Sequence, residues 1–207
     1  MLELKQALAL SSSAVAGRSQ TGGFLLGTTA EGYAMRIHAG SCWILDDDDT
    51  VRGFAITLPD PVFRASELWS RRDAVAWSMD PAPVEARRLA YFDQLAVDRS
   101  LSARRWSVAL ALVSLLEIVE QGAEILITAT VREPFINLAA VPFIERLGGR
   151  IIGRIDEHYP EIGDLVSDIW MVEPEGWSHF LAEHSRRAGQ SLARARAALD
   201  AHPRGAR

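Results

Sequence analysis

The sequence predicts an α/β domain in which helices flank a mixed sheet. Strand-like and helical segments alternate along the chain, in the order hairpin, helix, strand, helix, strand, helix, strand, strand, as is typical of such domains. The segment 106–119 is apolar on nearly every side, which is typical of a helix buried against a sheet. Apolar residues make up 48% of the 207 residues, so the chain can build a real core.

The first sixty residues predict a strand, helical turns and a hairpin. Residues 2–7 alternate apolar and polar side chains, as in a half-buried strand. Residues 8–40 are expected to form helical turns with glycine-rich breaks. The runs at 41–45 and 51–58 read as the two strands of a hairpin. The four aspartates between them, at 46–49, are interpreted as a solvated turn and not as a calcium site.

The middle of the chain predicts an alternation of helices and strands. A helix is expected at 65–77, and a strand at 90–97 after a proline-containing break. The apolar helix at 106–119 is followed by a strand rich in β-branched residues at 123–131. A second helix is expected at 137–148, where glycines end it.

The C-terminal end predicts two strands and one long helix. The strands are expected at 150–156 and 165–172. Apolar residues at spacings of three and four run through 175–200, with arginines on the other faces, so this segment predicts an amphipathic helix. We therefore divide the chain into a main domain, 1–173, and a C-terminal helix and tail, 174–207. Two interpretations of that helix stay open, a contact in a homodimer or with another partner, and docking on its own domain.

Composition and charge exclude several classes of function. The net charge of −5 argues against a general nucleic-acid binder, which is normally basic. No apolar run approaches the roughly 20 residues that span a bilayer. The single cysteine, Cys42, argues against a disulfide framework or a cysteine-rich zinc site and favours a reducing compartment. We expect a cytoplasmic protein with no nucleic acid, membrane or metal as a partner.

A polar stretch joins the strand at 90–97 to the apolar helix. The first N–H groups of a helix have no intrahelical partner, so such a connection often holds a phosphate. Phosphate-binding loops usually carry glycines, because the backbone must approach the ligand closely. Here Arg104, Arg105 and Trp106 stand in the stretch instead.

Two segments, in this order, carry a resemblance to a known family. The first has Val97 and Asp98 at the strand end, followed by the polar stretch and the helix. The second runs from Asn137 through Ala140 to Gly148. Over about residues 40–173 the chain resembles the GNAT superfamily of acyl-CoA-dependent N-acyltransferases. That family has Val-Asp-Pro before a Gln/Arg-x-x-Gly-x-Gly/Ala loop, and Asn-x-x-Ala before Glu-Lys-Leu-Gly-Phe.

The resemblance implies a GNAT-like fold, with a mixed, mostly antiparallel central sheet flanked by helices and here a C-terminal helical extension. It implies acetyl-CoA or another acyl-CoA as co-substrate, with the pyrophosphate held by backbone N–H groups of the loop. The positions that it assigns to cofactor binding are Leu95, Ala96, Val97, Ser102, Ala103, Arg104, Arg105, Trp106, Ser107, Asn137 and Ala140. Arg105 takes the place of the first glycine, so two outcomes stay open: arginine-assisted binding, or a site that no longer binds coenzyme A.

The resemblance also directs the search for catalytic groups. A carboxylate on or near the central strands often acts as the base in this family, and Asp93 and Glu133 are the candidates. Asp93 shares side-chain parity with Leu95, so it is either in the acceptor pocket or turned away from it. An N–H around Ala96 and Val97 is expected to polarise the thioester carbonyl. The family's proton-donating tyrosine corresponds here to Ile144.

Three functional hypotheses follow. The first is an N-acetyltransferase that transfers an acyl group from acyl-CoA to a small-molecule or peptide amine, by direct attack in a ternary complex. The second is a catalytically inactive GNAT-fold protein that acts as a ligand-sensing or partner-binding module; the altered loop and Ile144 favour it. The third is an interaction module whose arginine-rich C-terminal helix is the working surface.

Overall fold

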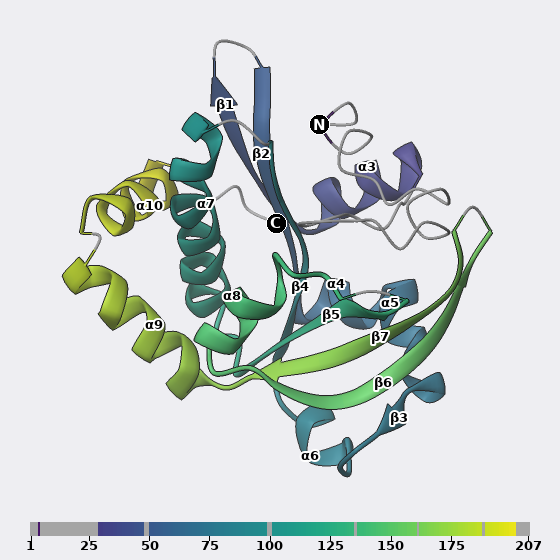
Figure 1. Ribbon diagram of the computed structural model, residues 1–207. Coiled ribbons are helices and arrows are strands. Elements are labelled where there is room, and N and C mark those ends of the chain that lie inside the picture. The colour runs from purple at the N-terminus through teal and green to yellow at the C-terminus, as the bar shows by residue number, and fades with distance from the viewer. Residues whose placement is uncertain are drawn as a thin grey trace.

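The computed structural model describes residues 4, 29–47, 50–98, 101–134, 136–160, 162–187 and 189–201. These residues form one seven-stranded sheet with the order β1-β2-β4-β5-β7-β6-β3. Among the pairs of described strands, only β4–β5 is parallel; the other five are antiparallel. The mixed, mostly antiparallel sheet flanked by helices is therefore confirmed (Figure 1).

The strands are β1 (Ser41–Asp47), β2 (Thr50–Pro59), β3 (Ala76–Trp77), β4 (Leu89–Val97), β5 (Ile125–Glu133), β6 (Arg150–Tyr159) and β7 (Gly163–Val172). The helices are α3 (Ala30–Ala39), α4 (Asp60–Arg64), α5 (Glu67–Ser70), α6 (Ala82–Glu85), α7 (Leu101–Glu120), α8 (Val141–Arg146), α9 (Pro174–Arg187) and α10 (Gly189–Ala201), with a 3₁₀ turn η1 (Arg71–Ala74).

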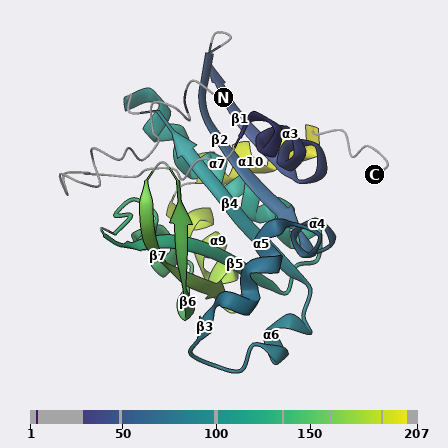
Figure 2. The same cartoon turned by 90° about the vertical axis from the view of Figure 1, so that its right-hand side faces the viewer.

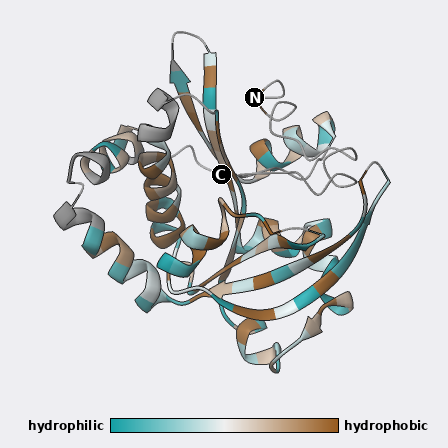
Figure 3. Cartoon of the chain, viewed as in Figure 1, coloured by the Kyte–Doolittle hydropathy of each residue, from teal (hydrophilic) through white to brown (hydrophobic). Residues whose placement is uncertain are grey.

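Two helical layers cover the sheet. Helices α7 to α10 lie on one face, and α3 to α5 lie on the other (Figures 1 and 2). Helix α7 is apolar over most of its length (Figure 3), and Leu112 and Leu115 bury completely against the first face. Tyr33 of α3 and Phe63 of α4 fill the core on the second face. A sheet buried on both faces positions the functional residues rigidly between the two layers.

Three expected elements differ from the structure. Leu4, the one described residue of the strand expected at 2–7, is helical and buried, and the rest of that strand lies outside the described residues. The helix expected at 65–77 is α5, η1 and β3 in succession, because the β-compatible pair Ala76–Trp77 pairs with β6. The expected C-terminal helix is two helices, and the second begins at Gly189, a residue that weakens a helix interior.

The two C-terminal helices pack on the main part of the chain. Helix α10 contacts α7, and Ala195 of α10 is buried in the core around α7, as are Trp177 and Phe180 of α9. Docking on its own domain, one of the two interpretations of this segment, is therefore confirmed. Among the described helices, none combines the length and the apolar character that crossing a bilayer requires.

Candidate active site

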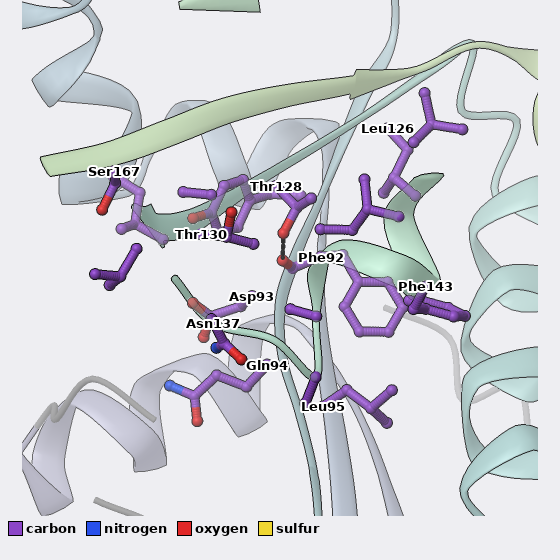
Figure 4. A pocket seen from close by; sticks show the side chains of 18 of the residues that line it. Phe92, Asp93, Gln94, Leu95, Leu126, Thr128, Thr130, Asn137, Phe143 and Ser167 are labelled. Carbon is purple, nitrogen blue, oxygen red and sulfur yellow. Dashed lines mark hydrogen bonds between the residues drawn. The ribbon is translucent and has the colours of Figure 1, made fainter. Parts of the chain in front are cut away.

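The two central strands separate halfway along their length. Strands β4 and β5 pair only where Leu89–Tyr91 face Ile125–Ile127, although each strand continues for six more residues. At the point of separation the hydroxyl of Thr128 donates to the carbonyl of Phe92 at 2.8 Å (Figure 4). Beyond this bond an opening passes through the sheet.

A cavity of about 220 Å³ occupies the opening and reaches both faces of the sheet. Its apolar limb, on the face of α7 and α8, is lined by Phe92, Leu126, Phe143, Ile144, Leu147 and Val172. Its polar collar, on the face of α3 and α5, is lined by Arg36, Glu67, Arg71, Asp93, Gln94, Glu157, Tyr159 and Ser167. A ligand that crosses the sheet here meets an apolar wall on one side and charged groups on the other.

A β-bulge aims Asp93 into the polar collar. Phe92 pairs with Thr57 and Gln94 with Ile56, so Asp93 is the extra residue of β4. The bulge resets the alternation of side chains along the strand. Leu95 therefore packs on the α7 face, whereas Asp93 Oδ2 accepts a hydrogen bond from Arg36 Nη1 of α3 at 2.8 Å. The sequence predicted that Asp93 and Leu95 point to the same face of the sheet, which left open whether Asp93 enters the pocket. The two side chains point to opposite faces because of this one inserted residue, so the predicted parity is wrong.

Asp93 has the electrostatics of a proton acceptor. Only 7% of its side chain is exposed, and this burial raises its pKa, while the Arg36 guanidinium acts in the opposite direction. No described residue donates to its second oxygen, Oδ1. On the next residue, Gln94 Oε1 accepts from the Tyr33 hydroxyl at 2.7 Å, which fixes the strand on the far side of the bulge. The carboxylate is thus held by one oxygen and offers the other to the cavity.

Glu157 of β6 is a second carboxylate in the collar, half-buried with 12% of its side chain exposed, and sequence reasoning missed it. Its Oε1 accepts from Arg71 at 2.9 Å and from the Tyr159 hydroxyl at 3.2 Å, and its Oε2 accepts from Ser167 at 2.7 Å. Burial and the Glu157 charge raise the pKa of Tyr159. The sequence did contain a signal for this residue. Glu157 lies two residues after the core residue Ile155 and therefore on the same face of the strand.

The other predicted base lies elsewhere. Glu133 is exposed at the end of β5 and is not among the residues that line the cavity. A register shift between Val131 and Glu133 occurs at this strand end, so the alternation along β5 does not carry over to it. Of the predicted cofactor residues, Leu95, Asn137 and Ala140 do line the cavity.

The backbone of β4 presents N–H groups to the opening. The N–H of Asp98 donates to the carbonyl of Arg52 on β2. Because N–H groups alternate in direction along a strand, that of Ala96 also faces β2, whereas those of Leu95 and Val97 face the opening. Of the two predicted N–H donors, only that of Val97 therefore faces away from β2, but Val97 is not among the residues that line the cavity, whereas Leu95 is.

The polar stretch before the apolar helix is itself helical. Helix α7 begins at Leu101, and no glycine interrupts the chain between Asp98 and Gly122. Ser102, Ala103, Arg104, Arg105, Trp106 and Ser107 are all in its first two turns, and the side chains of residues 101–105 lie outside the described part. From position 105 on, an α-helical N–H bonds to the carbonyl four residues back. The expected irregular loop at 102–107 is thus replaced by a helix start.

Helix α10 approaches this end of α7. The Arg194 guanidinium lies 4.3 Å from the centre of the Trp106 ring, and 38% of Trp106 is exposed. On α8, Ile144 is buried in the apolar limb at the position of the family's tyrosine. It brings no hydroxyl to the cavity.

No family model matches the chain, and no curated protein sequence does either. Among solved structures, the chain is similar to FeeM, an N-acyl amino acid synthase from uncultured soil microbes, with a TM-score of 0.52 and 13% identity over 86% of this chain and 93% of that one. It also matches a chain of the NatC complex bound to Gag peptide and CoA, with a TM-score of 0.49 and 13% identity over 78% and 87% of the two chains. An aminoglycoside 6'-acetyltransferase type Ii matches with a TM-score of 0.48 and 14% identity over 83% and 87%. Together with the separated strands β4 and β5, the likeness to FeeM shows that the chain has the fold of the GNAT superfamily.

Proposed function

We propose that the protein is an acyl-CoA-dependent N-acyltransferase that transfers an acyl group, acetyl in the simplest case, to an amine. The cavity that crosses the sheet carries this proposal, because it joins an apolar limb to a charged collar at the separation of β4 and β5. A thioester entering from the α7 and α8 face and an amine entering from the α3 and α5 face meet inside it. The likeness in fold to FeeM, an N-acyl amino acid synthase, agrees with this reaction class.

Asp93 is the proposed general base. A carboxylate with a raised pKa takes a proton from an ammonium group more readily than an ordinary one, and burial raises the pKa of Asp93. The ammonium gives one proton to Oδ1, and the amine nitrogen attacks the thioester carbonyl. The tetrahedral intermediate then collapses: the carbon–sulfur bond breaks, and the second proton on the nitrogen goes to the departing thiolate, so that the amide and the free thiol of coenzyme A are released. The N–H of Leu95, which faces the opening from a residue that lines the cavity, is the proposed donor to the developing oxyanion.

The donor is proposed to lie along β4 and at the start of α7. Leu95, Asn137 and Ala140, which line the cavity, contact its pantetheine portion. The first backbone N–H groups of α7, from residues 101–103, and the arginines at 104 and 105 hold the pyrophosphate. We place the protein in the cytoplasm, on the basis of its single cysteine.

A catalytically inactive ligand-sensing protein is the second candidate. Two observations favour it: α7 starts without a glycine at its N-terminal turns, and Ile144 stands where the family has a tyrosine. A side chain at position 105 takes up space that a bound pyrophosphate would need. It leaves the N–H groups and the helix dipole intact, because these are properties of the backbone.

Calorimetric titration with acetyl-CoA, followed by an acetylation assay with a panel of amines, tests the proposal. We expect micromolar binding to the unmodified protein, and a loss of at least 100-fold in kcat/KM for Asp93→Asn, in the range of general-base catalysis. Glu133→Gln is the matched control, because this carboxylate lies outside the cavity, and it should change kcat/KM less than twofold. Absence of binding to acetyl-CoA and to longer acyl-CoA would reject the transferase, and binding restored by Arg105→Gly would identify a closed cofactor site.

A further inference from the structure

A second cavity lies beside the polar collar. It has a volume of about 80 Å³ and lies between the sheet and the segment from α4 to α6. Its walls are mainly apolar and aromatic and include Phe63, Trp69, Val75, Trp77, Val84 and Ile155. Leu68, Arg71, Tyr91, Ala129 and Glu157 line both cavities. The reaction cavity and the apolar pocket therefore adjoin, and these five residues form their common boundary.

The charge of the collar selects the polar group of a ligand. Three carboxylates, those of Glu67, Asp93 and Glu157, face two guanidiniums, those of Arg36 and Arg71, so one negative charge is in excess. Both guanidiniums are already paired: Arg36 with Asp93 at 2.8 Å and Glu67 at 3.7 Å, and Arg71 with Glu157 at 2.9 Å. An ammonium group neutralises the excess, whereas a carboxylate on the ligand adds to it and finds both cations engaged.

The volume of the second cavity selects the size of the apolar group. A cavity of about 150 Å³ accommodates benzene, and 80 Å³ is about half of that. The walls are braced against expansion: the guanidiniums of Arg64 and Arg72 lie 4.6 and 5.0 Å from the centre of the Trp69 ring, and Trp77 Nε1 donates to the carbonyl of Arg72 at 3.2 Å. An aliphatic group of three or four carbons fits this space, and an indole does not.

We propose that the acceptor is a cationic primary amine with a short branched aliphatic group and no carboxylate beside the amine. Its ammonium group meets Oδ1 of Asp93, and its aliphatic group occupies the second cavity, which adjoins the collar at Arg71 and Glu157. The inference rests on the proposed function and narrows its acceptor. The N-terminal residue of a peptide and a free aliphatic amine both present this chemistry.

Four matched acceptors test the charge and the size separately. Leucinamide carries the ammonium and an isobutyl group, leucine adds a carboxylate, glycinamide lacks the isobutyl group, and tryptophanamide replaces it with an indole. We expect kcat/KM for leucinamide to exceed that for glycinamide by at least about 10- to 100-fold, because a single methylene in an apolar pocket already changes kcat/KM by about 10- to 200-fold. We expect it to exceed that for leucine by at least tenfold. Isopentylamine, compared with leucinamide, distinguishes a free amine from a peptide N-terminus.

Two variants assign the preference to the second cavity. Val75→Phe fills it from the half-buried rim, and should lower kcat/KM for leucinamide far more than for glycinamide, so that the ratio of the two falls to about one. Trp69→Leu enlarges it and should raise kcat/KM for tryptophanamide. A preference for leucinamide that survives Val75→Phe, or equal rates for leucine and leucinamide, would overturn the inference and leave the transferase intact.

Binding without acyl-CoA separates this inference from the proposed function. We expect leucinamide alone to raise the melting temperature, and Val75→Phe to abolish the rise. That result, in a protein that fails to bind any acyl-CoA, would support the pocket and reject the transferase. No stabilisation by leucinamide, together with no transfer to it, would reject the pocket.

Discussion

The ion pair between Arg36 and Asp93 gives a quantitative test of the site. Arg36→Met removes the guanidinium and leaves Asp93 charged in a place where 7% of its side chain is exposed. Removing one partner of a buried pair costs about 3–5 kcal/mol, which in a protein of this size lowers the melting temperature by about 6–20 °C. The same change should raise the pKa of Asp93 further, because burial then acts without its opposing charge.

This cost should depend on pH in a defined direction. The pKa of Asp93 in the folded protein is above its ordinary value of 3.8, so proton binding at this site favours the folded state. Protonation of Asp93 therefore adds to the free energy of unfolding at low pH, and this contribution is lost as the pH rises through the folded pKa of Asp93. The destabilisation by Arg36→Met should therefore be smallest in acid and grow toward pH 8.

Urea unfolding followed by tryptophan fluorescence measures the free energy of unfolding at each pH. The double variant R36M/D93L should recover most of the loss, because it removes both charges. Glu67→Gln is the control, since Glu67 lies 3.7 Å from Arg36 but is 65% exposed, and should cost less than about 1 kcal/mol. A loss below about 1 kcal/mol at pH 8, or an equal loss at every pH, would refute the description of Asp93 as a desolvated carboxylate held by one arginine.

Other contacts give smaller predictions. Tyr33→Phe removes the buried donor to Gln94 and should cost about 1–3 kcal/mol in the free energy of unfolding. Gly176→Ala should destabilise by about 1–3 kcal/mol, although alanine favours helices, because its Cβ would clash with the carbonyl oxygen of Leu147. Thr128→Val removes the hydrogen bond from the hydroxyl to β4 and should increase amide hydrogen exchange beside the separation of the strands. Thr128→Ser keeps the hydroxyl, so exchange there should stay as in the unmodified protein.

The architecture was largely predictable from the sequence, because it depends on long periodic segments. The hairpin of β1 and β2, the strand β4 and the buried helix α7 all follow from the spacing of apolar residues. The local geometry of the site was not predictable in this way. One extra residue at Asp93 reverses the side-chain alternation of β4, and a pattern of period two contains no sign of such a bulge.

The partners of the site residues were also hidden in the sequence. Glu157 and Arg71 are 86 positions apart, and Arg36 and Asp93 are 57 apart. Such pairs are set by the order of strands in the sheet, and no local spacing reports them. The start of α7 was placed too late because the resemblance assumed a loop, whereas the residues from Leu101 on are compatible with a helix and include no glycine before Gly122.

The short ladder between β4 and β5 also has a consequence for the order of folding. Three residue pairs join a half-sheet of β1, β2 and β4 to one of β5, β7, β6 and β3. The hairpins β1–β2 and β6–β7 close over a few residues, whereas the parallel pair closes only across the whole of α7. Because closing a longer loop costs more entropy and parallel pairing is slow, we expect β1–β2–β4 and β5–β7–β6 to form first and to join late, as does β3, which precedes β4 in the chain but pairs with β6. The active site is then created by the last step of folding, since its walls belong to both halves.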